Sequence, residues 1–155
     1  MSHSYQVKVV WTGNRGDGTA DYAAYARDHQ IIVRGKPIIE ASADAAFRGD
    51  ARRHNPEDLL VAALSTCHML WYLHLAADAG IIVTGYRDEA VGEMTVDPRA
   101  GGAFTSVVLR PVVTMRAGEP DLARGLHEEA NRRCFIANSV NFPVTHEASI
   151  LVEPG

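Results

Sequence analysis

The most reactive side chains of the chain are its two cysteines, Cys67 and Cys134. A buried cysteine on its own is usually an inert apolar side chain. Two thiols that folding brings together can instead form a redox pair. Cys134 follows Arg132 and Arg133, whose charges favour a thiolate if they lie beside its sulfur and otherwise face water at a helix end. These residues therefore predict thiol redox chemistry if the cysteines meet, and inert packing if they do not.

Seven histidines accompany the two cysteines, so a metal site is the next candidate. The short ligand spacings of zinc sites, such as CxxC, HxxxH and HExxH, do not occur. His68 and His74 are six residues apart and point to different sides of a helix. Cys67 and His74 share a helix face, but a rise of about 10 Å is too long for a direct hydrogen bond. We therefore expect no bound metal, no bound cofactor and no Cys67–His74 dyad.

The composition indicates a single folded domain over residues 1–155. The 155 residues are 46% hydrophobic and 22% charged, as expected for a chain that folds around a core. The formal net charge of -4 gives no field that would attract a phosphate backbone, so nucleic acid is not an expected partner.

The cysteine count and the first residues favour the cytoplasm. Two cysteines are too few for a disulfide-rich secreted scaffold, and MSHSYQVKVV lacks the basic and apolar regions of a signal peptide. The stretch Leu59–Ala77 has no Asp, Glu, Lys or Arg, and its length approaches the ~20 residues of a membrane helix. Because it contains two histidines, Ser65, Thr66 and Tyr72, we expect a helix buried in protein and no membrane partner.

Turn and cap residues divide the chain into alternating blocks of strand and helix. Asn55, Pro56, Glu57 and Asp58 are typical of a helix start and Gly80 of its end, which predicts a helix of about 25 residues. The expected order is strands at Tyr5–Thr12, Tyr22–Val33 and Lys36–Ala41, a loop at Ser42–His54, that long helix, strands at Ile81–Val96 and Phe104–Met115, a helix from Glu119 toward Cys134, and a strand at Val144–Val152. This order favours an α+β fold.

The string HNPEDLLVAALSTCH, residues 54–68, resembles the NPE and cysteine signature of the OsmC and Ohr family of organic hydroperoxide reductases. The segment ANRRCFIANSV around Cys134 is similar to that family's resolving-cysteine helix. The resemblance implies an OsmC-like α+β fold, with antiparallel sheets wrapped around a long central helix. It also implies an intertwined homodimer with its active sites at the interface.

The resemblance also implies roles for individual residues. Cys67 becomes the peroxidatic cysteine, Cys134 the resolving cysteine, and Glu57 the partner of an activating arginine. For that arginine Arg48 is the first choice, Arg27 the second and Arg15 the third, because the family places it at variable positions in the N-terminal half. His68 and Phe135 depart from the family pattern, in which an apolar residue follows the first cysteine and Pro often follows the second.

The spacing of Glu57 and Cys67 limits how they can cooperate. Ten residues on an unbroken helix separate them by about 15 Å. Either an arginine spans the gap, or the helix breaks, or Glu57 serves the cysteine of a second subunit.

The implied reaction converts an organic hydroperoxide to an alcohol and leaves a sulfenic acid on Cys67. Cys134 condenses with it to a disulfide, which an external dithiol reduces. The resemblance implies a lipoylated protein as that dithiol. Apolar neighbours are expected to favour an organic tail over hydrogen peroxide. They are Leu64, Met69, Leu70, Trp71 and Phe47.

Two other functions remain open from the sequence. One is a thioester or acyl hydrolase with Cys67 as nucleophile and His54 or His146 as base. The other is a non-catalytic binder of a hydrophobic ligand, for which neither thiol is needed.

Overall fold

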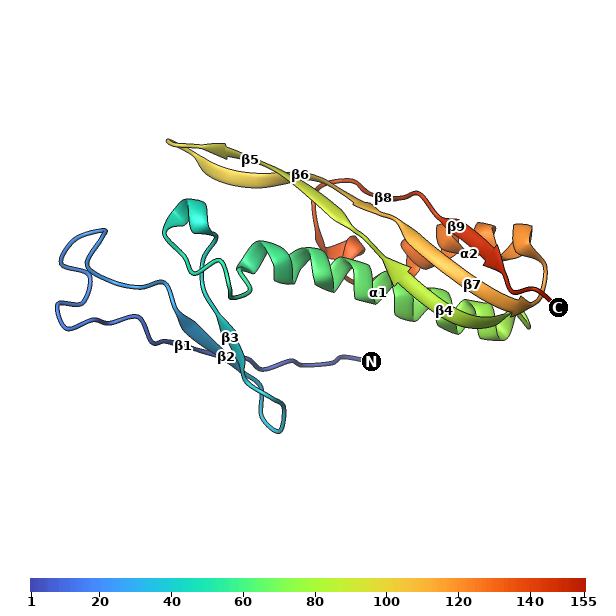
Figure 1. Cartoon of the computed structure of the whole chain (residues 1–155), viewed down its shortest axis with the longest axis horizontal. Helices are drawn as coiled ribbons and strands as arrows, with labels where there is room; N and C mark the ends of the chain where they lie inside the picture. The colour runs from blue at the N-terminus through green and yellow to red at the C-terminus, as the bar shows by residue number, and fades with distance from the viewer. The chain divides into compact units, whose positions relative to one another are not determined.

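The computed structural model describes residues 1–155, which form two compact units, Met1–Leu59 and Leu60–Gly155 (Figure 1). Each unit is described by itself below. The expectation of a single domain over the whole chain stays a prediction.

The first unit contains a small antiparallel sheet in the order β1-β2-β3. Its strands are β1 (Lys8–Trp11), β2 (His29–Ile32) and β3 (Ile39–Ala41). The strand expected at Tyr22–Val33 is wrong over its first half. There the Arg27 guanidinium donates to the carbonyls of Tyr22 and Tyr25, both at 2.6 Å, and the Trp11 indole donates to the Ala26 carbonyl at 2.8 Å. Side chains thus satisfy backbone groups that a sheet would otherwise pair.

The segment expected as a loop at Ser42–His54 is irregular apart from one 3-10 turn, η1 (Ala45–Phe47). The Asp44 carboxylate caps this turn by accepting from the Ala46 amide at 2.7 Å. The turn ends at Arg48, which has φ 63° and is the chain's one non-glycine residue with positive φ. A left-handed conformation costs an L-residue about 1–2 kcal/mol, so the surrounding loop holds Arg48 in a strained backbone state.

The long helix α1 runs without interruption over Pro56–Asp78. At its start the Asn55 side chain accepts from the Asp58 amide at 2.8 Å, and the Asp58 carboxylate accepts from the Asn55 amide at 3.5 Å. At its end Gly80 has φ 71°, and the Ile81 amide donates to the Ala76 carbonyl at 2.9 Å. This is a glycine-terminated Schellman ending, and both predicted helix boundaries are confirmed.

The second unit holds two three-stranded sheets, β4-β7-β9 and β5-β6-β8. Their strands are β4 (Ile82–Asp88), β5 (Val91–Asp97), β6 (Gly101–Leu109), β7 (Pro111–Ala117), β8 (Val144–His146) and β9 (Ser149–Val152). Each long strand expected from the sequence is therefore two strands in different sheets. The breaks fall at Glu89–Ala90 and at Arg110, where the Asp88 carboxylate accepts from the Arg110 amide at 2.6 Å.

The sheets are mixed rather than wholly antiparallel. β8 pairs with β6 and β9 with β7 in parallel, whereas β4–β7 and β5–β6 are antiparallel. The chain reaches β8 through the helix α2 (Pro120–Arg133) and the 3-10 turn η2 (Ala137–Ser139). Two parallel strands need a crossover connection of this kind, because a short hairpin turn can join only antiparallel strands.

The core of the second unit is built on one stripe of α1. Its buried residues Leu64, His68, Tyr72 and Ala76 recur every four positions, one face of a helix. Leu64 packs with Val107 and Leu109 of β6, in a first cluster. Tyr72 and Ala76 pack in a second cluster with Val113 and Met115 of β7 and with Ala123 and Ala130 of α2. The first part of the buried stripe therefore packs on the β5-β6-β8 sheet and the second part on the β4-β7-β9 sheet.

The opposite face of α1 carries apolar side chains that the second unit does not cover. Ala62, Thr66, Leu70 and His74 also recur every four positions and are exposed, and Leu70 is 62% exposed. By length and composition α1 could cross a membrane, with 22% of its most apolar stretch buried, although core helices of soluble proteins pass the same test. The helix offers more apolar surface than its own unit buries.

Candidate active site

The fold brings the two thiols together. Cys67 lies on α1 and is half-buried, whereas Cys134 follows the last turn of α2 and is 1% exposed. Both thiols are free, and Cys67 lies close enough to Cys134 to raise the pKa of the Cys134 thiol. The segments that carry the two cysteines are thus neighbours in the fold.

The environment of Cys134 favours its protonated form. Burial, together with the neighbouring Cys67 thiol, raises its pKa to about 11, and the Ala137 amide, which donates to the sulfur at 3.4 Å, opposes the rise. Arg132 and Arg133 both bind the Glu129 carboxylate instead. The two arginines therefore lie at the end of the helix and pair with a carboxylate of the same helix. They do not stabilise a Cys134 thiolate.

The three other expected site residues belong to the first unit. Glu57 lies in the first turn of α1, and the unbroken helix removes the option of a break between Glu57 and Cys67. The Arg27 guanidinium is held locally, over the rings of Tyr22 and Tyr25 at 4.4 and 4.0 Å. Arg48 is exposed, and its guanidinium lies 5.9 Å from the Tyr22 ring centroid.

Backbone strain distinguishes Arg48 from the other candidate arginines. Strained conformations collect at functional sites, and inference runs from such an observation to a hypothesis of function. Arg15 lies in a loop where the Asn14 side chain accepts from the amides of Gly16 and Gly18. This loop has no comparable strain at a non-glycine residue, so Arg48 remains the first candidate.

A buried histidine pair adjoins the cysteines, and the sequence did not predict it. His68 and His127 are 1% and 0% exposed, and the Nε2 atom of His68 lies 2.9 Å from Nδ1 of His127. The Tyr72 ring stacks on His127 at 4.0 Å, and its hydroxyl donates to the Ala123 carbonyl at 3.0 Å. The available signal was the spacing of Ala123, His127, Ala130 and Cys134, which places His127 on the buried face of α2.

Burial keeps this pair uncharged. Desolvation, together with the neighbouring histidines, lowers the pKa of His68 to about 4 and that of His127 to about 3. The outer ring nitrogens, Nδ1 of His68 and Nε2 of His127, are buried without a hydrogen-bond partner. Whichever ring donates, one buried donor and one buried acceptor stay unpaired.

The candidate bases of a hydrolase, His54 and His146, make their contacts with other residues than Cys67. The Nδ1 atom of His54 is 3.9 Å from the Asp58 carboxylate in the first unit. The ring of His146 lies 5.6 Å from that of His68 and 5.7 Å from that of His127, with its Nε2 atom 3.5 Å from Glu128. No group of three or more His, Cys, Asp or Glu side chains is arranged to hold a metal ion.

An apolar pocket of about 260 Å³ opens on the same side of α1 as Leu70. It is lined by Leu70, Trp71, His74 and Phe135, and Trp71 meets Phe135 edge to face at 5.5 Å. Phe135, adjacent to Cys134, was not expected as a lining residue. Leu64 was expected there, but it is fully buried in the core with β6, and Phe47 belongs to the first unit.

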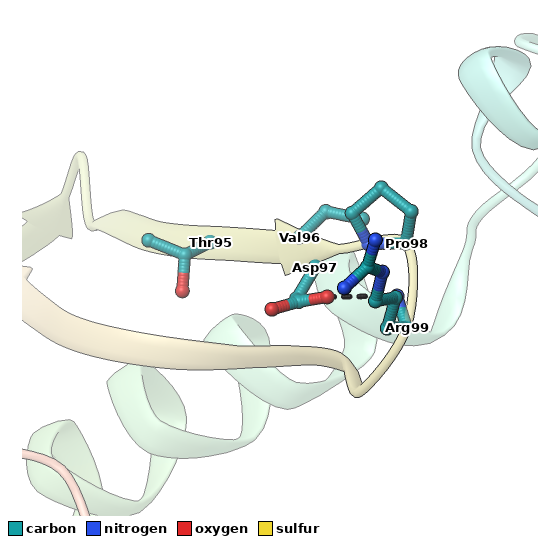
Figure 2. A pocket seen from close by; sticks show the side chains of 5 residues that line it. All are labelled: Thr95, Val96, Asp97, Pro98 and Arg99. Atoms are coloured by element: carbon teal, nitrogen blue, oxygen red, sulfur yellow. Dashed lines mark hydrogen bonds between the residues drawn. The ribbon is translucent and has the colours of Figure 1, made fainter.

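A second, larger hollow of about 530 Å³ lies at the tip of the β5–β6 hairpin (Figure 2). Five consecutive residues, Thr95–Arg99, line it. The Asp97 carboxylate accepts from the Arg99 amide at 2.7 Å and the Ala100 amide at 3.1 Å, and these bonds lower the pKa of Asp97. The hollow is the concave side of a turn and has no nucleophile.

Comparison with known proteins agrees with this fold and pair of cysteines. The sequence profile described as OsmC-like protein matches residues 49–149. The uncharacterized protein YmaD of Bacillus subtilis strain 168 is 27% identical over 157 residues, covering 96% of this chain and 95% of YmaD. The chain therefore belongs to the OsmC-like protein family, as its sequence predicted.

Solved structures are similar over nearly the whole chain. An OsmC-like protein of unknown function from Vibrio cholerae is 32% identical, with a TM-score of 0.86 over 95% of this chain and 99% of that one. An organic hydroperoxide resistance protein from Legionella pneumophila is 16% identical, with a TM-score of 0.68 over 96% and 97%. The similarity to the Legionella pneumophila protein, at this low identity, shows the fold alone. The two structures together confirm the predicted α+β OsmC-like architecture.

The lowered histidine pKa values predict that acid destabilises the protein. Between about pH 6.5 and pH 4 the unfolded chain binds protons at these positions and the folded chain does not, so the free energy of unfolding falls as pH falls. Replacing His127 by Leu removes one titrating group, and the slope decreases by up to about 1.4 kcal/mol per pH unit. Urea unfolding at fixed protein concentration measures this.

The control for this measurement is His3→Gln, a change at an exposed histidine that leaves the wild-type slope unchanged. A His127→Leu protein with the same slope as the wild type would contradict the prediction.

Proposed function

We propose that the protein is a thiol peroxidase that reduces organic hydroperoxides to alcohols, with Cys67 as the attacking thiol and Cys134 as the resolving one. The observation that carries this proposal is the proximity of the chain's only two thiols, one on α1 and the other directly after α2. Membership of the OsmC-like family, in which relatives of the same fold are named organic hydroperoxide resistance proteins, supports it.

The unequal surroundings of the two sulfurs support this division of roles. Cys134 is fully buried and its pKa is about 11, so at neutral pH it is a thiol and a poor nucleophile. Cys67 is half-buried and has access to the surface. A peroxide from solution therefore meets Cys67 first.

The proposed cycle balances without a bound cofactor. The Cys67 thiolate attacks one peroxide oxygen, the O–O bond breaks, and the leaving alkoxide takes up a proton to become the alcohol. Cys67 is left as a sulfenic acid. The Cys134 sulfur attacks it, the S–S bond forms, and the Cys134 proton leaves with the hydroxyl group as water. An external dithiol then gives up two hydrogens to restore both thiols.

Arg48 and Glu57 are the proposed activating pair. A guanidinium is always charged, so it stabilises the Cys67 thiolate and then the developing alkoxide. A carboxylate fixes the guanidinium by bidentate hydrogen bonds. The strained backbone at Arg48 and its freedom from an acidic partner support its choice over Arg27, whose guanidinium already binds two carbonyls.

The apolar pocket beside α1 is the proposed site for the organic part of the substrate. Leu70, Trp71 and Phe135 contribute apolar surface there, and burial of an alkyl group contributes about 25 cal/mol per Å². Hydrogen peroxide gains nothing from such a surface. We therefore propose alkyl or fatty hydroperoxides as the substrate class, and the cytoplasm, where thiols stay reduced, as the compartment.

We also propose that the working protein is a homodimer. The exposed face of α1 runs from Ala62 to His74 over between three and four turns, carries no Asp, Glu, Lys or Arg and exposes Leu70, and a contiguous surface of this kind favours an interface. A second copy that covers it also offers a way for Glu57 of one subunit to serve Cys67 of the other. Closed two-fold pairing is the commonest solution for such a face.

Cysteine variants test the peroxidase. With cumene hydroperoxide and an excess of dithiothreitol, we expect Cys67→Ser to abolish peroxide consumption, because the nucleophile is lost. In a separate assay without dithiothreitol, which would itself reduce a sulfenic acid, we expect pre-reduced Cys134→Ser to consume one peroxide per subunit and to trap sulfenic acid, detected by dimedone labelling and mass spectrometry.

The same variants separate the other functions. Ester cleavage that is lost in Cys67→Ser and kept in Cys134→Ser would support a hydrolase instead. Ligand binding that survives both changes, without peroxide consumption by the wild type, would support a non-catalytic binder.

Removing Arg48 tests the activation of Cys67. In a Cys134→Ser background, we expect Arg48→Ala to slow iodoacetamide labelling of Cys67 at pH 7 by at least about tenfold, because an unassisted thiol is only a few per cent ionised there. Arg27→Ala tests the second choice, and Arg34→Ala, at an exposed residue of the same unit, is the control. Slow labelling that none of these changes alters would contradict the activation.

A charge on the exposed face of α1 tests the dimer. We expect light scattering to give about 34 kDa for the wild type, twice the 16.8 kDa of one chain. Ala62→Arg buries a charge in the interface and should give monomers. Gly125→Arg, on α2 where an added side chain meets nothing within 4 Å, should stay dimeric. A monomeric wild type, or a dimeric Ala62→Arg protein, would contradict the proposal.

A further inference from the structure

The histidine pair joins the two helices that carry the cysteines. His68 is the next residue after Cys67 on α1. His127 precedes Cys134 by seven residues, which is about two helical turns and returns to the same face of α2. The bond between the two rings therefore joins the same two helices that bring the two thiols close to one another.

The two rings meet head-on. Their planes differ by 3°, and their centroids are 5.3 Å apart with 2.9 Å between Nε2 of His68 and Nδ1 of His127. The centroid separation is the longest that this nitrogen distance allows, so each facing nitrogen points straight at the other. This is the geometry of a linear hydrogen bond.

The same geometry argues against a metal ion between the rings. Zinc lies about 2.0–2.1 Å from each histidine nitrogen in a tetrahedral site, which needs facing nitrogens well over 3 Å apart and turned toward a common point. At 2.9 Å and in line, the two nitrogens leave no space for an ion.

Stability alone does not explain a hydrogen bond between two histidines at this position. The rest of the α1 and α2 buried stripes consists of Leu64, Ala76, Ala123 and Ala130, together with Tyr72. Apolar side chains could fill the same space, whereas the two histidines leave one buried donor and one buried acceptor unpaired, which lowers the stability of the folded state. What a linear hydrogen bond adds to apolar packing is a fixed distance and direction.

We propose that His68 and His127 are positioning residues that clamp α1 to α2 in the register at which the Cys67 and Cys134 sulfurs meet. The inference rests on the proposed pairing of these cysteines in a disulfide. A disulfide tolerates little variation in sulfur and Cβ geometry, so a shift of one helix along the other slows its closure. The stacked Tyr72 ring and its bond to Ala123 hold His127 from the other side.

The test measures disulfide closure in the folded, reduced protein with diamide, to which the two thiol hydrogens pass. We expect His127→Leu, which fills the space but cannot bond, to slow closure by about tenfold or more. We expect His127→Asn to restore closure to within about threefold of the wild type, because the Asn side chain places a polar atom where Nδ1 stood. Mass spectrometry of alkylated samples follows the reaction.

The control separates positioning from a general loss of stability. Val113→Ala removes buried volume in the core without removing a bond between α1 and α2, and should close at the wild-type rate. Fast closure in His127→Leu, slow closure in His127→Asn, or equal slowing in Val113→Ala would overturn the clamp. If His127→Leu does not fold, His68→Met and its polar counterpart His68→Gln give the same comparison from the other ring.

This experiment does not depend on peroxide chemistry. A wild type that closes the disulfide with diamide but consumes no organic hydroperoxide would contradict the proposed function and leave the clamp standing. Normal peroxide turnover with closure rates unaffected by His127→Leu would overturn the clamp alone.

Discussion

The contact between α1 and α2 is the constraint on which the chemistry of this protein depends. Cys67 and Cys134 are far apart in sequence, so only the packing of the fold can bring them together. They meet because the buried stripe of α1 packs on the buried face of α2 and on β7. The sheets matter to the site mainly through this packing, since they fix the surface on which both helices lie.

Burial makes the two sulfurs chemically different. Cys134 is buried and has a pKa of about 11, whereas Cys67, its neighbour in the fold, is in partial contact with the surface. Two thiols of equal acidity would compete for the same peroxide. A buried neutral thiol does not react with the peroxide, and it reacts only after the neighbouring cysteine has been oxidised. The order of events in the proposed cycle thus follows from desolvation, with no moving part required for the first step.

Much of this fold could be predicted from local signals, and the failures have identifiable causes. Asn55 and Gly80 gave the ends of α1 because caps are local interactions. The split of each long strand at Ala90 and Arg110 depends on the Asp88 carboxylate, a contact across 22 residues that no periodicity reveals. The spacing on α2 could place His127 on the buried face, but its bond to His68, 59 residues away, is visible only in the fold. The arginine cannot be chosen from spacing, because backbone strain is visible only in three dimensions.

The polar residues of α1 explain how so apolar a helix takes a single orientation. A helix that is largely apolar on all sides has no strongly polar face to fix its rotation about its own axis. Apolar packing alone also allows such a helix to shift along its neighbours. Three successive turns carry a directed bond: Ser65 donates to Asp88 at 2.5 Å, His68 bonds His127, and Tyr72 donates to the Ala123 carbonyl. These bonds reach the end of β4 and two points on α2, which together specify rotation and register. Cys67 lies between the first two of them, so the same bonds that orient the helix also direct its thiol.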